Sequence, residues 1–383
     1  MANKDERKKP ETPPKSALNV MRGVAGGHDG MPENGRTGNH SPARERHPIS
    51  TEQYVEGVRS GDRTMLGRTI TLIESNTQPH QDQAQDVLKA LMPYTGNSIH
   101  VGITGVPGAG KSTFIETLGS RLTSRGHKVA VMAVDPSSSV TRGSILGYKT
   151  RMEQLSQDPN AFIRPSPSGG TLGGVARKTR ETMLVFEAAG YDVLLVETVG
   201  VGQSDITVRS MVDFFLLILI AGAGDELQGI KKGVMELADT ILVNKADRDN
   251  VQQANLARAE YERALHYLQP ATKGWKTKAV TASALEGTGL DELWEQIVAF
   301  EKTTRANGEF MKRRAEQTRS WLHSMLEERL KASFYSNEAV VEILPGIEQQ
   351  VMDGSLPATQ AAWKLLRTFE DFMIRTWKGK DRP

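Results

Sequence analysis

Apolar and polar residues follow two alternating patterns through the middle of the chain. Short apolar runs, which predict buried strands, cover His100–Thr104, Val129–Val134, Val193–Glu197, Phe214–Ala221, Ile241–Asn244 and Lys278–Thr281. Apolar residues recur at helical spacing over Lys111–Arg125, Val175–Ala189, Ile230–Leu237, Asn250–Tyr267 and Leu290–Phe300. Apolar strands that alternate with helices predict an α/β fold with a doubly wound, mostly parallel sheet.

Helical patterns without strands flank this α/β region. From Ser50 to about Tyr94 the pattern is helical, with breaks at Gly61–Asp62 and Gln78–His80. After about Arg305, amphipathic helices follow that either pack on their own domain or form a dimerisation arm. Residues 1–49 have too little apolar content to bury a core. We therefore predict a disordered tail over 1–49, a helical segment over 50–96, the α/β domain over 97–305 and a helical arm over 306–383.

A phosphate-binding loop follows the first predicted strand. The sequence Gly105-Val-Pro-Gly-Ala-Gly-Lys-Ser112 comes after an apolar run and opens a helical pattern, as a P-loop does. Its glycines let backbone N–H groups point at phosphates, and the dipole of the next helix adds positive potential. We expect Lys111 to bridge the β- and γ-phosphates and Ser112 to bind Mg²⁺. The predicted nucleotide contacts are Gly105, Gly108, Ala109, Gly110, Lys111, Ser112 and Thr113.

A second motif selects the base. Asn244-Lys245-Ala246-Asp247 follows a buried strand and has the form NKxD. The carboxylate of Asp247 can accept hydrogen bonds from N1–H and the exocyclic amine of guanine, a pair that adenine cannot donate. The segment Ser283-Ala284-Leu285 comes third in order, where a backbone N–H usually contacts the guanine oxygen. The predicted substrate is therefore GTP, with Asn244, Lys245 and Asp247 as predicted nucleotide contacts and Lys245 lying along the base and bracing the P-loop.

Two carboxylates fall at strand ends beside the predicted phosphates. Asp135 follows one strand and Glu197 ends another, so with Ser112 they form the predicted metal site for Mg²⁺. Gly200 can bring its N–H to the γ-phosphate, which gives Lys111, Glu197 and Gly200 as the predicted catalytic residues. Val201 stands where small regulatory GTPases place their catalytic Gln, and Gln203 lies two residues on. We therefore predict slow basal hydrolysis that a partner accelerates.

The amino-acid composition limits which classes of function and of binding partner fit the sequence. The 383 residues carry a formal net charge of +2, which gives no indication of nucleic-acid binding. The absence of cysteine excludes disulfides and thiolate metal sites, and with them nickel- or zinc-insertion GTPases that use such ligands. The longest apolar run, Phe214–Ala221, is too short to cross a membrane. We expect a cytoplasmic enzyme that binds neither membranes nor nucleic acid.

Several long motifs together give a specific resemblance. In addition to the P-loop they are Ala133-Val-Asp-Pro-Ser-Ser-Ser139, Lys149-Thr-Arg-Met152, Glu197-Thr-Val-Gly-Val-Gly-Gln-Ser204 and Asp225-Glu-Leu-Gln-Gly-Ile-Lys-Lys-Gly233. In this order they resemble the MeaB/ArgK/MMAA family of P-loop GTPases, of the SIMIBI class. The resemblance covers Ser50 to the C-terminus.

The resemblance implies a function and partners. Such proteins are homodimeric GTPase chaperones of adenosylcobalamin-dependent acyl-CoA mutases, chiefly methylmalonyl-CoA mutase. They gate cofactor delivery from an adenosyltransferase, an indirect partner, and protect the mutase without binding cobalamin themselves. The segment Gly222–Lys232 matches the family's third switch loop, so Asp225, Gln228 and Lys231 are predicted switch residues, as is Gln203.

One departure from the family keeps other interpretations open. Tyr148 stands in Leu146-Gly-Tyr-Lys-Thr-Arg-Met152 where relatives usually have Asp, and a neutral phenol cannot replace a switch carboxylate near Mg²⁺. A diverged GTP-binding scaffold with weak hydrolysis is therefore one alternative. Another is a P-loop kinase or ATPase of the arginine/ornithine transport type. The mutase could be of the methylmalonyl-, isobutyryl- or ethylmalonyl-CoA type.

Overall fold

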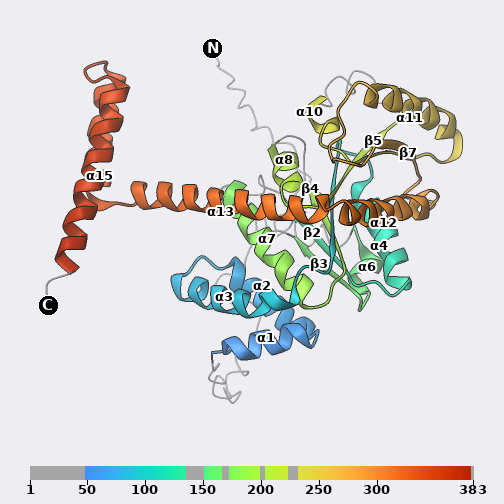
Figure 1. The fold of residues 1–383 in the computed structure, drawn as a ribbon, viewed down its shortest axis with the longest axis horizontal. Helices are drawn as coiled ribbons and strands as arrows, with labels where there is room; N and C mark the ends of the chain where they lie inside the picture. The colour runs from blue at the N-terminus through green and yellow to red at the C-terminus, as the bar shows by residue number, and fades with distance from the viewer. Residues whose placement is uncertain (1–47, 135–150, 166–171, 199–202, 223–231, 381–383) are drawn as a thin grey trace, which may run out of the picture. The chain divides into compact units, whose positions relative to one another are not determined.

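The structure, a computed structural model, describes residues 48–134, 151–165, 172–198, 203–222 and 232–380 (Figure 1). From Ile49 onward they belong to one compact unit. The tail predicted over residues 1–49 lies almost wholly outside the described residues. Among the described residues, no helix combines the length and apolar character that a membrane crossing requires.

A parallel sheet forms the centre of this unit. Its strands are β1 (Ile99–Gly105), β2 (Val129–Val134), β3 (Ala161–Pro165), β4 (Val193–Thr198), β5 (Phe214–Ile220), β6 (Thr240–Asn244) and β7 (Lys278–Thr281). Their order is β3-β2-β4-β1-β5-β6-β7, and every neighbouring pair is parallel. The carboxyl ends of all these strands therefore meet at one edge, as the prediction of a doubly wound α/β sheet requires.

Helices cover both faces of the sheet (Figure 1). One face packs against α4 (Lys111–Ser124), α6 (Glu153–Gln157) and α12 (Leu290–Ala306). The other packs against α1 (Thr51–Arg59), α2 (Arg63–Glu74), α3 (Gln78–Leu91), α7 (Leu172–Ala188) and α8 (Gln203–Arg209). A third cluster joins β5 and β6 to α11 (Val251–Leu265), and the short α10 (Lys232–Met235) precedes β6. Because strand side chains alternate, Ile103 faces α4 while Val196 faces α7. The predicted fold class is confirmed.

The amino-terminal helices begin at clear capping signals. Ser50 and Gln53 form a capping box at the start of α1, and Asp62 accepts from two backbone N–H groups at the start of α2. The break predicted at Gln78–His80 was wrong, since α3 begins at Gln78. Pro79 sits in its first turn, where a missing N–H costs nothing. The chain instead leaves helical geometry just before, after Glu74.

Three further helices complete the carboxyl-terminal part: α13 (Glu309–Tyr335), α14 (Glu338–Met352) and α15 (Ala358–Lys380). Helix α13 packs on α12 and α7 and then on α14, which packs in turn on α15 (Figure 1). Along α13, Leu322, Leu326 and Leu330 are more than half exposed, and four-residue spacing places them on one face. We call these three residues the α13 stripe.

Buried charges fasten the first turns of α13 to the amino ends of the strands. Arg314 donates from Nε and Nη2 to the two oxygens of Asp213, at 2.8 and 2.6 Å, and Asp213 directly precedes β5. Arg313 lies 3.6 Å from Asp239, which precedes β6. Three carboxylates and three guanidinium groups meet here, so their formal charges balance. This basal ion cluster consists of Glu187, Arg209, Asp213, Asp239, Arg313 and Arg314.

Candidate nucleotide site

The P-loop links β1 to α4 through positions that only glycine fits. Gly105 has φ 153°, and a Cβ there would lie 2.1 Å from the carbonyl oxygen of Ile218 on the neighbouring strand. Gly110 has φ 87°, and its Cβ would meet Nδ2 of Asn244 at 2.7 Å. Both residues therefore need a left-handed backbone and a missing side chain. The loop closes tightly and directs the amino end of α4 toward the predicted phosphates.

Lys111 is held over this loop. Its Nζ donates to the carbonyl oxygen of Gly105 at 2.8 Å and of Val106 at 3.3 Å. Burial lowers the pKa of Lys111, while the negative charges of Glu197 and Asp205 oppose that shift. The ammonium group of Lys111 thus lies beside two P-loop carbonyl oxygens and near the amino end of α4, where it can bind a terminal phosphate.

Glu197 meets the amino end of α4. It stands beside Ile103 in the register of β4 and β1, and its side chain is buried. The hydroxyl of Ser112 donates to its Oε1 at 3.4 Å. A hydroxyl and a carboxylate oxygen side by side are the hard donors that Mg²⁺ takes, so the residues present fit the predicted ion. The third predicted ligand, Asp135, lies outside the described residues, within which no group of three or more acidic or histidine side chains gathers for a metal.

Asn244 joins the three nucleotide motifs to one another. It is buried, and its Nδ2 donates to the carbonyl of Ala109 in the P-loop at 2.7 Å. Its Oδ1 accepts from the backbone N–H of Ala284 at 2.9 Å. One N–H and one lone pair of the amide are used in this way, so Asn244 fixes two loops to each other and keeps a second N–H for the predicted contact with the base.

The residues expected to recognise guanine lie beside this junction. The hydroxyl of Ser283 donates to Oδ2 of Asp247 at 2.6 Å, which orients the half-buried carboxylate. Lys245 and Arg248 have positive φ of 61° and 49°. Such backbone angles in residues with side chains are uncommon and concentrate at ligand-binding segments. Leu285 and Thr113 are exposed.

Several other predicted site residues cannot be placed. Gly200, Tyr148, Asp225, Gln228 and Lys231 lie outside the described residues. Gln203 begins α8, but its side chain is outside the described part as well. Their roles stay predictions.

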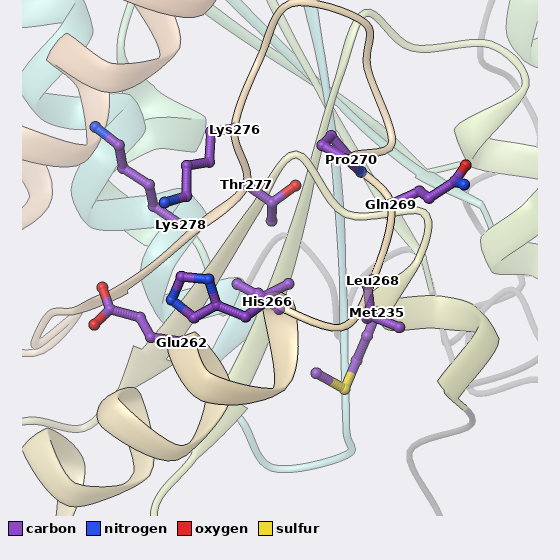
Figure 2. A pocket seen from close by; sticks show the side chains of 10 residues that line it. Met235, Glu262, His266, Leu268, Gln269, Pro270, Lys276, Thr277 and Lys278 are labelled. Carbon is purple, nitrogen blue, oxygen red and sulfur yellow. The ribbon is translucent and has the colours of Figure 1, made fainter.

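A separate cavity of about 610 Å³ lies at the end of α11 and the start of β7. Figure 2 shows His266, Lys276 and Lys278 around it, together with apolar side chains. It contains none of the predicted nucleotide residues. Lys278 begins β7, whereas the nucleotide motifs follow the carboxyl ends of strands, so this cavity is distinct from the nucleotide site.

Comparison with known proteins decides the family. The family model described as methylmalonyl Co-A mutase-associated GTPase MeaB matches residues 66–339, which include the P-loop, Glu197 and the NKxD motif. The chain belongs to this family.

Relatives of the MeaB family extend the match beyond single motifs. GTPase ArgK of Escherichia coli is 50% identical over 286 residues, which are 75% of this chain and 86% of that protein. The mitochondrial methylmalonic aciduria type A homolog of Mus musculus is 41% identical over 329 residues, which cover 83% of this chain and 79% of that protein. A crystal structure of an LAO/AO transport system kinase superposes with a TM-score of 0.69 at 39% identity, covering 85% of this chain and 99% of that one. The chain is a GTPase of the MeaB family, and the resemblance read from its motifs is confirmed.

Proposed function

We propose that this GTPase hydrolyses GTP at the P-loop and acts as a chaperone of an adenosylcobalamin-dependent acyl-CoA mutase. The observation that carries the proposal is the convergence of Lys111, Glu197 and the Asn244 junction at one edge of the parallel sheet. The family's description as mutase-associated supports methylmalonyl-CoA mutase as the partner. In this role the protein gates loading of the cofactor and protects the mutase.

Guanine selection in the proposal depends on Asp247. Ser283 holds one carboxylate oxygen at 2.6 Å, so the side chain is oriented before the nucleotide arrives. An oriented carboxylate that loses its donors when adenine replaces guanine disfavours ATP strongly. In the Ser283–Leu285 segment the N–H groups of Ser283 and Ala284 donate to Thr288 and Asn244, so the N–H of Leu285 is the one proposed to contact the guanine oxygen.

In the proposed site Ser112 and Glu197 would hold Mg²⁺, with Asp135 as a further ligand, and the bound ion would place positive charge against the phosphate oxygens. Lys111 supplies a second positive charge, and the P-loop N–H groups add fixed dipoles. These groups act by position and electrostatics, because water attack on a phosphoryl group needs little covalent help from the protein.

The proposed oligomer is a homodimer built through the helical arm over residues 306–383. The α13 stripe leaves apolar surface open to solvent, and so do Trp363 and Ile374 on α15. Apolar side chains in such numbers on paired long helices are typical of a surface that a second copy covers. Direct cobalamin binding is not part of the proposal, and an adenosyltransferase enters only as the source of the cofactor. The cytoplasmic location stays a prediction.

Complex formation tests the partner. A purified adenosylcobalamin-dependent acyl-CoA mutase from the same source is mixed with the protein and passed over a sizing column, with GDP or a non-hydrolysable GTP analogue present. The proposal predicts co-elution that depends on the bound nucleotide. Separate elution in both nucleotide states, at concentrations above micromolar, would contradict the chaperone role.

A further inference from the structure

A buried carboxylate that no sequence motif indicated lies on α8. Asp205 is fully buried. A carboxylate removed from water is costly unless hydrogen bonds or charges compensate it, so its partners show what it is there to hold.

Those partners form a directed chain of hydroxyl groups. Oγ1 of Thr104 donates to Oδ1 of Asp205 at 2.5 Å, and Oγ1 of Thr198 donates to Oγ1 of Thr104 at 2.9 Å. Both threonines are fully buried. An ionised carboxylate only accepts, and each hydroxyl has one proton, so the direction of both bonds is fixed. Each bond strengthens the other in this low-dielectric setting.

These hydrogen bonds, which we call the hydroxyl relay, connect β1 and β4, the two strands that lead into the candidate catalytic groups. Thr104 directly precedes Gly105 of the P-loop, and Thr198 directly follows Glu197. Ile103 and Glu197 are partners in the register of β1 and β4, so the two threonines come next on the neighbouring strands. Because side chains alternate along a strand, the threonines face α8 while Glu197 faces α4 and Ser112. The hydroxyl relay of Thr198, Thr104 and Asp205 therefore lies on the opposite face of the sheet from the contact between Ser112 and Glu197.

We infer that Asp205 is a positioning residue for GTP hydrolysis, which sets the spacing between Glu197 and Ser112 through Thr104 and Thr198. The inference rests on the proposed role of Glu197 in holding Mg²⁺. Asp205 does not touch the nucleotide, so it acts on turnover and on the response to Mg²⁺ more than on nucleotide affinity.

The test compares Asp205→Asn and Thr104→Val with the wild-type protein. Three quantities are measured: kcat for GTP, the GTP concentration for half-maximal rate, and the Mg²⁺ concentration for half-maximal rate. We expect kcat to fall about tenfold to hundredfold, since misplacement near 1 Å costs up to ~10² in rate. Half-saturation by Mg²⁺ is expected to need about tenfold more ion, with GTP half-saturation changed less than about threefold.

A matched control separates positioning from general stability. Thr304 is buried on α12, and its hydroxyl donates to the carbonyl of Phe300 at 2.7 Å. In the sequence it is far from the ends of β1 and β4, which carry Thr104 and Thr198. Thr304→Val removes a buried hydroxyl as Thr104→Val does, and it should leave kcat and the Mg²⁺ response unchanged. Thr104→Ser, which keeps the hydroxyl, should restore most of the wild-type turnover.

The measured kcat values and Mg²⁺ responses decide between a positioning role for Asp205 and a purely structural one. If Thr104→Val behaves like Thr304→Val in kcat and in Mg²⁺ response, the inference is overturned, and this comparison holds even where Asp205→Asn does not fold. If hydrolysis by the wild-type protein is independent of Mg²⁺, the proposed role of Glu197 fails and the inference fails with it. A Mg²⁺-dependent wild type with selective loss in the relay variants supports both.

Discussion

Replacing Arg314 by Met tests whether the basal ion cluster holds α13 in place. In the native protein Arg314 donates to both oxygens of Asp213 and to the carbonyl of Ser98, at 2.8, 2.6 and 2.7 Å. Burial raises the pKa of Asp213, but His100 and Arg314 more than offset it, so the net pKa lies below the ordinary value. Asp213 is thus a buried anion that depends on its partners.

Methionine keeps roughly the apolar stem of the arginine side chain and removes the charged guanidinium group. Asp213 then stays buried at 1% exposure without its guanidinium partner, and breaking such a pair costs about 3–5 kcal/mol. We expect the free energy of unfolding, measured by urea titration, to fall by about that amount. Adding Asp213→Asn to Arg314→Met should recover about 1–3 kcal/mol relative to the sum of the single changes, because the two residues are coupled.

Lys312→Met supplies the control on the same helix. Lys312 pairs with Glu316 at 3.8 Å, and both side chains are more than 60% exposed. An exposed pair of this kind contributes about 0.3–0.5 kcal/mol. If Arg314→Met costs less than about 1 kcal/mol, so that it resembles the control, the cluster does not fasten α13 as described.

Three further predictions concern the base, the metal and the pH response. Asp247→Asn should lower the kcat/KM for GTP by about 10² or more and favour xanthosine triphosphate, whose C2 carbonyl accepts from the new amide; unchanged GTP selectivity would show that another group reads the base. Glu197→Gln keeps the shape but loses the charge, so turnover should drop at least about tenfold with a weaker Mg²⁺ response, and wild-type rates across a Mg²⁺ titration would refute this. Burial raises the pKa of Glu187, but hydrogen bonds from His100 and other groups lower it overall to about 2 from an ordinary 4.5. The stability from this ionised carboxylate, about 3 kcal/mol, is present above pH 4.5 and lost as the pH falls toward 2; Glu187→Gln should flatten that part of the pH–stability curve, and an unchanged curve would count against the assignment.

Sequence patterns predicted the strands and nucleotide loops well because their signals are local. The six strand ranges read from apolar runs end within one residue of the observed strands, and the conformation of Gly105–Ser112 depends on glycines within the loop itself. The edge strand Ala161–Pro165 was not predicted, because it is short, contains Arg164 and ends in proline. Its pairing with β2 gives it strand geometry that its own residues do not indicate.

The sequence patterns did not predict the hydrogen bonds and ion pairs between side chains of distant segments. Asp205 and Thr104 are 101 positions apart, as are Arg314 and Asp213. No periodicity links such pairs, because they meet only after parallel strands align their ends. A further role of Asn244 was missed for the same reason: the motif indicated the base, and the folded chain shows that the amide also joins Ala109 to Ala284.

The most direct measurement of the central claim is the rate of GTP hydrolysis with and without a purified adenosylcobalamin-dependent acyl-CoA mutase from the same source. The account predicts slow turnover by the protein alone and a marked acceleration at saturating mutase, of the kind that partner ordering gives in other GTPases, where it reaches ~10³–10⁵. Equal rates in the presence and absence of saturating mutase would contradict it.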